Sequence, residues 1–196
     1  MRVAIVTDRF LPTRDPVTAA VLHLVDELRD ADHEILLIAP DTPRGAPPAD
    51  RVYEGIRVHR VPALRRAGRA PTGLPWPRLR RVLRGFGPDV VHLIGPGLLG
   101  YGGLRAARRL RVPVVAVEYG DRAGPAACHL YRRATRTLTV GQTGLNDLVA
   151  HRIPRLHYWP AGRVGTGAGG ELVEHYRQAC ATPRRRGVAH PVASLR

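Results

Sequence analysis

Short unbroken apolar runs alternate along the chain with longer segments in which apolar residues recur every three or four positions. Residues 2–7 and 34–39 are two such runs, and their length is typical of strands buried on both faces. Between them, four apolar residues follow the spacing of one helix face: Val17, Val21, Leu24 and Leu28. A strand, a crossover helix and a strand predict a parallel βαβ unit, with loop 8–14 at the carboxyl edge of the sheet, where open α/β folds bind ligands.

The same alternation continues beyond the first unit. Buried strands are expected at residues 89–94, 113–117 and 137–140, and helices at 78–86, 98–110 and 143–151. Residues 55–61 alternate apolar and polar side chains like a half-exposed edge strand, and the Pro-rich segment 62–77 reads as irregular. This order predicts an α/β fold with a Rossmann-like, doubly wound parallel sheet.

The pattern also predicts a division of the chain near residue 160. Residues 1–160 read as one Rossmann-like domain, whereas residues 162–170 hold five glycines and residues 183–196 have little to bury. We therefore expect residues 161–196 to be a Gly/Arg-rich hinge remnant and a mobile tail, with an isolated helix at 171–180.

All 31 basic residues are arginines, and the formal net charge is +15. A GC-rich genome explains such a composition, and so does a surface that attracts anionic lipid, nucleic acid or phosphorylated ligands without specificity. No helix-turn-helix or zinc-finger pattern predicts a specific nucleic-acid partner. The helix at 78–86 has an apolar face and an arginine-rich face, so it fits either a surface helix over the sheet or a helix on an anionic membrane.

The remaining composition points to the cytoplasm. Cys128 and Cys180 lie far apart without C-x-x-C spacing, so neither a zinc site nor a disulfide framework is expected. No stretch reaches the roughly 20 apolar residues of a membrane span, and Met1 runs directly into a strand, which leaves no room for a signal peptide. The inner face of the plasma membrane is the alternative location if the basic helix binds lipid.

Two motifs could carry chemistry. Gly95-Pro-Gly-Leu-Leu-Gly100 is a G-x-G-x-x-G sequence between a strand and a helix, which fits a dinucleotide fingerprint. Against that interpretation, the chain holds 21 glycines, Pro96 removes an amide, and the motif lies in a later βαβ unit. We therefore expect no cofactor. Glu118, Tyr119 and Asp121 follow a strand's carboxyl end, which fits a ligand site or an ordinary loop with a helix cap.

Several stretches together resemble a known family. They are Phe10-Leu-Pro-x-x-Asp15-x-Val-Thr18, His33-Glu-x-Leu-x-Ile-Ala-Pro40, Tyr53-Glu-Gly-Ile-Arg-Val-His-Arg-Val-Pro62, Pro88-Asp-Val-Val-His-Leu93 and Arg136-Thr-Leu-Thr139. Over residues 1–164, the chain is similar to the amino-terminal half of retaining GT-B glycosyltransferases of family 4, and especially to GDP-mannose-dependent α-mannosyltransferases with lipid or lipoglycan acceptors. The resemblance implies that this half binds the acceptor, while a second domain binds the nucleotide sugar.

The resemblance also implies a set of site residues without a metal. Tyr119 and Asp121 are the catalytic candidates, and the substrate-binding candidates are Arg9, Arg14, Asp15, Gly95, Glu118 and Gly141. The functional loops depart from the family: Asp15-Pro16 replaces Asp-Gly or Gly-Gly, and Val140-Gly141 replaces Pro-Ser. Proline offers no N–H to a diphosphate.

Two hypotheses follow from the resemblance and its departures. In the first, the chain is an acceptor domain that transfers a hexosyl group, such as mannosyl, once a donor-domain protein completes it. In the second, it is an inactive or repurposed domain that binds a small molecule, a partner transferase or an anionic membrane. A homo-oligomer is the alternative to a donor-domain protein as partner. Whether the chain alone is an enzyme stays open between them.

Overall fold

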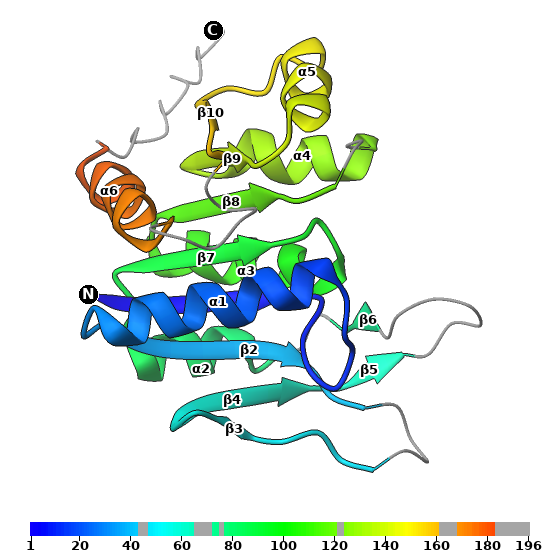
Figure 1. The fold of residues 1–196 in the computed structure, drawn as a ribbon, viewed down its shortest axis with the longest axis vertical. Helices are drawn as coiled ribbons and strands as arrows, with labels where there is room; N and C mark the ends of the chain where they lie inside the picture. Colours follow the sequence, from blue (N-terminus) through cyan, green and yellow to red (C-terminus); the bar gives the residue numbers. More distant parts are fainter. Residues whose placement is uncertain (43–46, 65–71, 75–76, 121–123, 161–167, 183–196) are drawn as a thin grey trace, which may run out of the picture.

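The computed structural model describes residues 1–42, 47–64, 72–74, 77–120, 124–160 and 168–182 (Figure 1). The described strands are β1 (Arg2–Thr7), β2 (Glu34–Pro40), β3 (Val52–Tyr53), β4 (Ile56–Val61), β5 (Ala63–Leu64), β6 (Thr72–Gly73), β7 (Val90–Ile94), β8 (Val114–Glu118), β9 (Arg136–Thr139) and β10 (Leu156–Tyr158). The described helices are α1 (Pro16–Asp30), α2 (Leu79–Phe86), α3 (Leu98–Leu110), α4 (Pro125–Arg133), α5 (Gln142–Ala150) and α6 (Ala168–Ala181).

Within the described ranges, eight strands form one sheet in the order β10-β9-β8-β7-β1-β2-β4-β3. Every pair is parallel except β3 with β4, which are antiparallel. The strands after β1 are added on one side through β2 and then on the other side through β7, so the order reverses between β1 and β7. The predicted doubly wound Rossmann-like fold is therefore confirmed.

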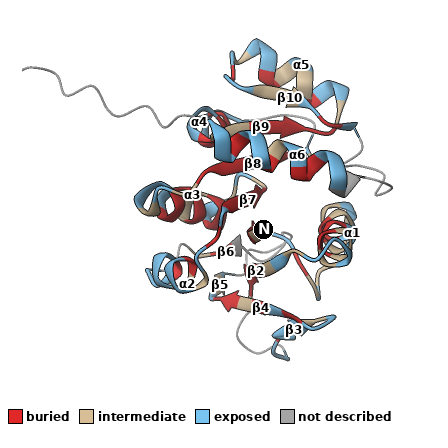
Figure 2. Cartoon of the chain, turned by 90° about the vertical axis from the view of Figure 1, so that its left-hand side faces the viewer, coloured by how far each residue is buried: buried red, intermediate tan, exposed pale blue. Residues whose placement is uncertain are grey.

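Helices cover both faces of this sheet (Figure 2). On one face, α1 and α6 pack over a core that includes Val21, Leu28 and Leu172. On the other face, α2, α3 and α4 pack over a core that includes Leu83 and Leu104. Burial on both faces explains why β1 and β7 are apolar without alternation.

The structure adds elements that the sequence pattern did not predict. Segment 62–77, expected to be irregular, contains the two short antiparallel strands β5 and β6. Helix α4 lies between β8 and β9, where no helix was expected. The edge beside β4 is covered by β3, in which Val52 is exposed.

The helix expected at 171–180 is present as α6, but it is not isolated. Leu172, Val173 and Tyr176 are buried against the same core as α1. The Tyr176 hydroxyl hydrogen-bonds Nδ1 of His92 in β7 at 2.8 Å, and burial lowers the pKa of His92 to about 3. His92 is thus a buried histidine of the core with a hydrogen-bond partner. The division of the chain at residue 160 stays a prediction, and residues 183–196 of the expected tail lie outside the described ranges.

Candidate functional site

The strand order reverses between β1 and β7, and we call the region between the carboxyl ends of these two strands the crevice. Open α/β sheets bind ligands at such a reversal, because the loops after the two neighbouring strands turn to opposite faces. Here those loops are residues 8–15, which lead to α1, and residues 95–97, which lead to α3. Both lie at the end of the sheet toward which the arrows point in Figure 1.

Asp8 occupies this crevice. It directly follows β1, and its two carboxylate oxygens accept hydrogen bonds from the amides of Leu99 at 3.3 Å and Gly100 at 3.4 Å, in the first turn of α3. Burial raises the pKa of Asp8 to about 6, although the amides of Leu99, Gly100 and Gly97 and the charge of Arg9 oppose the shift. A carboxylate whose pKa is raised by burial more than it is lowered by its hydrogen-bond partners is a candidate functional group.

The glycines of the G-x-G-x-x-G motif make room for Asp8. A Cβ on Gly97 would lie 2.4 Å from the Asp8 Cγ and Oδ2 atoms, and a Cβ on Gly100 would lie 2.6 Å from the carbonyl oxygen of Gly95. Gly95 itself has a φ of +88°, which favours glycine. The motif is therefore explained by a close approach of the chain to itself, and the amides that a pyrophosphate would need already face a carboxylate.

Asp15 caps helix α1. Its Oδ1 accepts from the Thr18 amide at 2.8 Å, and its Oδ2 pairs with Nη1 of Arg9 at 2.7 Å. Partial burial raises the pKa of Asp15, but the hydrogen bonds from Arg9 and Thr18 outweigh it and lower the pKa overall. The structure thus brings together two of the predicted substrate-binding residues, while Arg14 lies exposed on the same loop.

Glu118, at the end of β8, is held by the protein itself. Its side chain is 4% exposed, Oε1 accepts from the Gly120 amide, and Oε2 accepts from the Thr139 hydroxyl at 3.2 Å. A Cβ on Gly144, in the first turn of α5, would lie 2.3 Å from Oε2. Through these contacts Glu118 links β8, β9 and α5. They favour its interpretation as part of an ordinary loop over that as a ligand-binding residue.

The other candidates lie around Glu118. Tyr119 is half-buried, packs against the core that contains α1, and has a pKa raised by burial. Gly141 is the N-cap residue of α5. Asp121, the second catalytic candidate, lies outside the described residues. The sequence candidates therefore divide among the β1 loop, with Arg9, Arg14 and Asp15, the β7 loop, with Gly95, and the loops after β8 and β9.

Sequence reasoning missed Asp8 as a site residue. The available signal was that Asp8 is the first charged residue after the apolar run 2–7. Its function as a hydrogen-bond acceptor for α3, 91 positions later in the chain, needed the strand order to be known.

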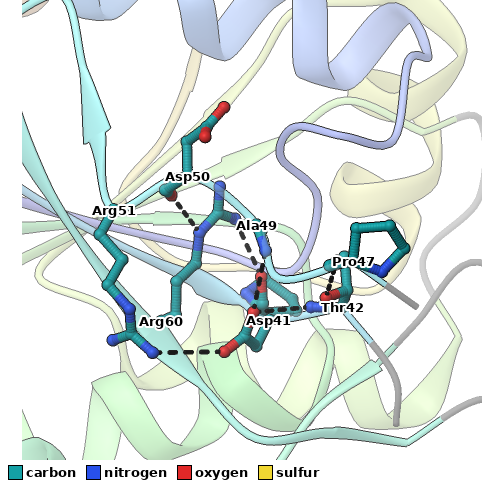
Figure 3. Close-up of polar contacts among 8 residues, drawn as sticks. Asp41, Thr42, Pro47, Ala49, Asp50, Arg51 and Arg60 are labelled. Carbon is teal, nitrogen blue, oxygen red and sulfur yellow. Dashed lines mark hydrogen bonds and ion pairs between the residues drawn. The ribbon is translucent and has the colours of Figure 1, made fainter. Parts of the chain in front are cut away.

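Sequence reasoning also missed Arg60, which hydrogen-bonds the backbone of the segment after β2 at the same edge of the sheet (Figure 3). Its side chain is 6% exposed, Nε donates to the Asp50 carbonyl at 2.8 Å, and Nη1 donates to the Pro40 carbonyl at 2.9 Å. The guanidinium lies 5.4 Å from the ring centroid of Phe10, in the β1 loop. Arg60 thus ties the segment after β2 to the loop that carries Arg9 and Asp15.

Beside Arg60, Asp41 organises the start of the segment after β2 (Figure 3). Asp41 Oδ1 accepts from the amides of Thr42 at 2.9 Å and Ala49 at 3.4 Å, and Oδ2 lies 3.8 Å from Nη2 of Arg51. All of these contacts join residues within 41–51, so they do not involve the loops after β1 and β7.

Positive charge is concentrated on one face of the molecule. Helices α2, α3 and α4 contain no acidic residue, and their exposed arginines are Arg80, Arg81, Arg84, Arg105, Arg108, Arg109, Arg132 and Arg133. On the opposite face, α1 carries Asp26, Glu27 and Asp30 beside Arg29. We call the α2–α3–α4 surface the arginine face.

The described residues contain no group of three His, Cys, Asp or Glu side chains that could hold a metal ion. Among the described helices, none combines the length and the hydropathy of a membrane span. A hollow of about 580 Å³ between α1 and α6 is lined by Glu27, His33 and Arg177 among others, but it lies near the amino ends of the strands, away from the crevice.

Solved structures define the class of fold. The chain resembles a sucrose-phosphate synthase chain from Thermosynechococcus elongatus, with a TM-score of 0.61, 13% identity, and coverage of 91% of this chain and 98% of that chain. It also resembles MurG from Acinetobacter baumannii, with a TM-score of 0.51, 19% identity, and coverage of 72% and 42%. The architecture is that of one Rossmann-like half of the GT-B fold.

Sequence comparison identifies the family. The model of Glycosyltransferase Family 4 matches residues 17–163. A GDP-mannose-dependent alpha-mannosyltransferase from Mycolicibacterium smegmatis is 52% identical over 184 residues, covering 85% of this chain and 49% of that protein. A protein of the same description from Mycobacterium tuberculosis is 46% identical, covering 83% and 47%. The chain therefore belongs to glycosyltransferase family 4, as its motifs indicated, and it spans about half the length of these relatives.

Proposed function

We propose that this chain is the acceptor-binding half of a retaining GT-B hexosyltransferase. It would contribute to the transfer of a hexosyl group, mannosyl by analogy with the relatives, from a nucleotide sugar to a lipid or small-molecule acceptor. Family membership supports the reaction class, and the crevice between β1 and β7 supports the acceptor side. The donor half would come from a further polypeptide segment, a partner protein or a second copy.

The observation that carries this assignment is the occupancy of the helix amides at the crevice. Asp8 faces the first turn of α3 and Asp15 caps α1, so each helix start holds a carboxylate of the chain itself. A diphosphate at either position would meet a like charge instead of free N–H groups. Stabilisation of the leaving diphosphate is therefore assigned to the other half of the enzyme.

The predicted catalytic and substrate-binding residues remain proposals within this function. Arg9 and Arg14 are on the β1 loop, and Tyr119 is at the end of β8, so these side chains reach the same edge of the sheet from two sides. Because Glu118 is already satisfied by Gly120 and Thr139, its proposed contribution is to position Tyr119 rather than to contact substrate.

A chimera tests the assignment. Residues 1–160 of this chain would replace the matching region of the Mycolicibacterium smegmatis relative, and hexosyl transfer from GDP-mannose to a lipid extract would be measured. We expect the chimera to transfer mannose and this chain alone to show no turnover. A folded chimera that binds GDP-mannose but transfers nothing would contradict the assignment, and turnover by this chain alone would contradict the need for a donor half.

A second candidate function rests on the arginine face. A surface with eight exposed arginines and no acid in its helices fits binding to an anionic membrane, which would place the protein at the inner face of the plasma membrane. This binding is compatible with a lipid acceptor, and it also fits a repurposed domain without transfer activity. Vesicle sedimentation, described in the Discussion, tests it separately from transfer.

A further inference from the structure

We propose that the hollow between α1 and α6 binds a small zwitterion with an apolar side chain, of the class of the apolar α-amino acids. Its volume of about 580 Å³ lies within the range of about 300–1,000 Å³ that is typical of ligand pockets. The hollow lies near the amino ends of the strands, and the six residues of β1 place it roughly 20 Å from the crevice. Binding there therefore does not depend on the proposed transfer reaction.

The hollow is formed by the C-terminal end of α1 and one side of α6, two helices that cover the same face of the sheet (Figure 2). The residues of α6 that line it are Gly170, Val173 and Arg177, which have the spacing of a single helix face. A Cβ added at Gly170 would meet nothing within 4 Å. Open space therefore reaches the backbone of α6 at this position.

Glu27 provides an unpaired acceptor in the wall of the hollow. Its Oε1 lies 3.4 Å from Nε2 of His23, whereas Oε2 is covered from solvent and has no hydrogen-bond partner among the described residues. Asp30 also lines the hollow, but it already accepts hydrogen bonds from Arg29 at 3.3 Å. The negative partial charge at the C-terminal end of α1 adds to the charge of Glu27. An ammonium group fits this position, because it is positive and only donates hydrogen bonds.

His33 provides an unpaired donor in the same wall. Its Nδ1 lies 3.3 Å from the Met1 ammonium, which can only donate, so Nδ1 accepts and the neutral ring carries its proton on Nε2. Burial and the charges of the Met1 ammonium and Arg177 lower the pKa of His33, which keeps the ring neutral at pH 7. Within the described ranges, Nε2 is covered from solvent and has no hydrogen-bond partner. Its N–H fits an acceptor such as a carboxylate oxygen.

The remaining lining accounts for the rest of the ligand. Arg177 is exposed, and its Nη1 lies 3.7 Å from Oε2 of Glu174. An exposed pair at this distance contributes little to stability, so the guanidinium is free to turn toward a ligand carboxylate. Leu28, Ala31 and Val173 add apolar surface to the wall. An apolar α-amino acid combines the ammonium, the carboxylate and the apolar side chain that these groups match.

Ordered water is the competing explanation for the two unpaired groups. A water molecule donates to a carboxylate and accepts from an imidazole N–H, so it would satisfy both Glu27 and His33. Water requires neither the cation of Arg177 nor an apolar wall, and a single molecule fills a small part of 580 Å³. The two explanations differ in whether an amino acid changes the signals of residues that line the hollow.

Titration of the full chain by NMR tests the proposal. The probes are L-leucine and L-phenylalanine, each added to about 20 mM because ligands of this size bind with dissociation constants on the order of 1 mM. Their amines, 3-methylbutylamine and 2-phenylethylamine, lack the carboxylate, and their acids, 4-methylpentanoate and 3-phenylpropanoate, lack the ammonium. We expect at least one amino acid to shift the amide signals of Val173 and Arg177, and to bind at least about tenfold more tightly than its amine or its acid.

Matched variants locate the site. Glu27→Gln removes the charge at nearly constant shape and should weaken amino-acid binding about tenfold or more. Gly170→Leu fills the open space with a better helix former and should abolish the shifts. Glu54→Gln, in the exposed turn between β3 and β4, and Gly85→Leu, at an exposed glycine of α2 with nothing within 4 Å, should bind like the wild type. Amide spectra that keep their dispersion show that each variant folds.

Three results would overturn the proposal. The first is the absence of shifts at Val173 and Arg177 with both amino acids, which is the result that ordered water predicts. The second is binding of an amine or an acid as tight as that of its parent amino acid, because the hollow would then recognise a single charge. The third is undiminished binding by a folded Gly170→Leu variant, which would place the ligand elsewhere.

Discussion

Replacement of Gly97 by alanine tests whether Asp8 and helix α3 are coupled as the structure indicates. The added Cβ would lie 2.4 Å from Cγ and Oδ2 and 2.6 Å from Oδ1 of Asp8, far inside contact distance. The backbone at Gly97, with φ −76° and ψ −177°, is one that alanine adopts freely. The variant therefore perturbs the Asp8 carboxylate and leaves the local backbone unstrained.

The expected cost follows from the two hydrogen bonds. A hydrogen bond to a charged group contributes about 1.5–3 kcal/mol, and both bonds here are long, so we take the low end for each and obtain roughly 3 kcal/mol. Alanine regains about 0.4–1 kcal/mol because it restricts the unfolded chain. The net loss in the free energy of unfolding is about 2 kcal/mol, which lowers the melting temperature by roughly 4–8 °C for a chain of this size.

Thermal unfolding monitored by circular dichroism measures this change. Gly124→Ala is the matched control, because a Cβ at Gly124 meets nothing within 4 Å and its φ is −63°. In an Asp8→Ala background the new methyl group has room, so Gly97→Ala should cost at least about 1 kcal/mol less there than in the wild type. A Gly97→Ala variant as stable as Gly124→Ala, or an equal cost in both backgrounds, would refute the coupling.

Three further predictions concern other parts of the structure. Burial and the nearby charges of Arg136 and His157 lower the pKa of His175 to about 4. Between about pH 6.5 and pH 4 the folded state therefore binds fewer protons than the unfolded state, and the folded state loses stability as the pH falls through this range. Chemical denaturation should show that the free energy of unfolding of His175→Phe, relative to the wild type, rises by about 1–2 kcal/mol when the pH is lowered from 7.5 to 5, after allowance for solvent screening. A difference between the two proteins that is independent of pH would contradict this. Asp8, whose pKa is raised, contributes a pH dependence of the opposite sign, but it does so equally in both proteins. Tyr176→Phe leaves Nδ1 of buried His92 without its partner and should cost about 1–3 kcal/mol in urea unfolding, and no loss would show that the hydrogen bond contributes nothing. Charge reversal of the three exposed arginines of α2 should reduce sedimentation with vesicles that contain phosphatidylinositol and not with neutral vesicles, at about 1 kcal/mol per residue, whereas unchanged sedimentation would exclude α2 from membrane binding.

Periodicity along the sequence predicted the main elements because each of them buries a continuous or periodic apolar surface. Strands β1, β2, β7 and β8 are buried on both faces, so their apolar runs could be recognised without knowledge of their neighbours. Helix α3 was predicted with the bounds that the structure shows. The pair β5–β6 and helix α4 were missed, because short elements in Pro-rich or Gly-rich segments leave too few residues for a period to appear.

The site was predicted less completely than the fold. Local spacing is enough to recognise a cap such as Asp15 at the start of α1, because the capping group and the amide lie three residues apart. It was not sufficient for Arg60, whose partners Pro40 and Asp50 are 20 and 10 positions away. The family resemblance named residues by motif, and the motifs did not include Asp8.

By itself, the sequence determined the class of fold and the family, because periodic burial and motif order are properties of the chain taken in one dimension. Only the tertiary structure showed that the glycines of the G-x-G-x-x-G motif allow close approach of the chain to itself. In the sequence, the glycines at 95, 97 and 100 match a dinucleotide fingerprint that other features argued against, and the pairing of β1 with β7 brings the carboxylate of Asp8 against them. That meeting depends on two strands separated by more than 80 residues, and only the folded sheet brings them together.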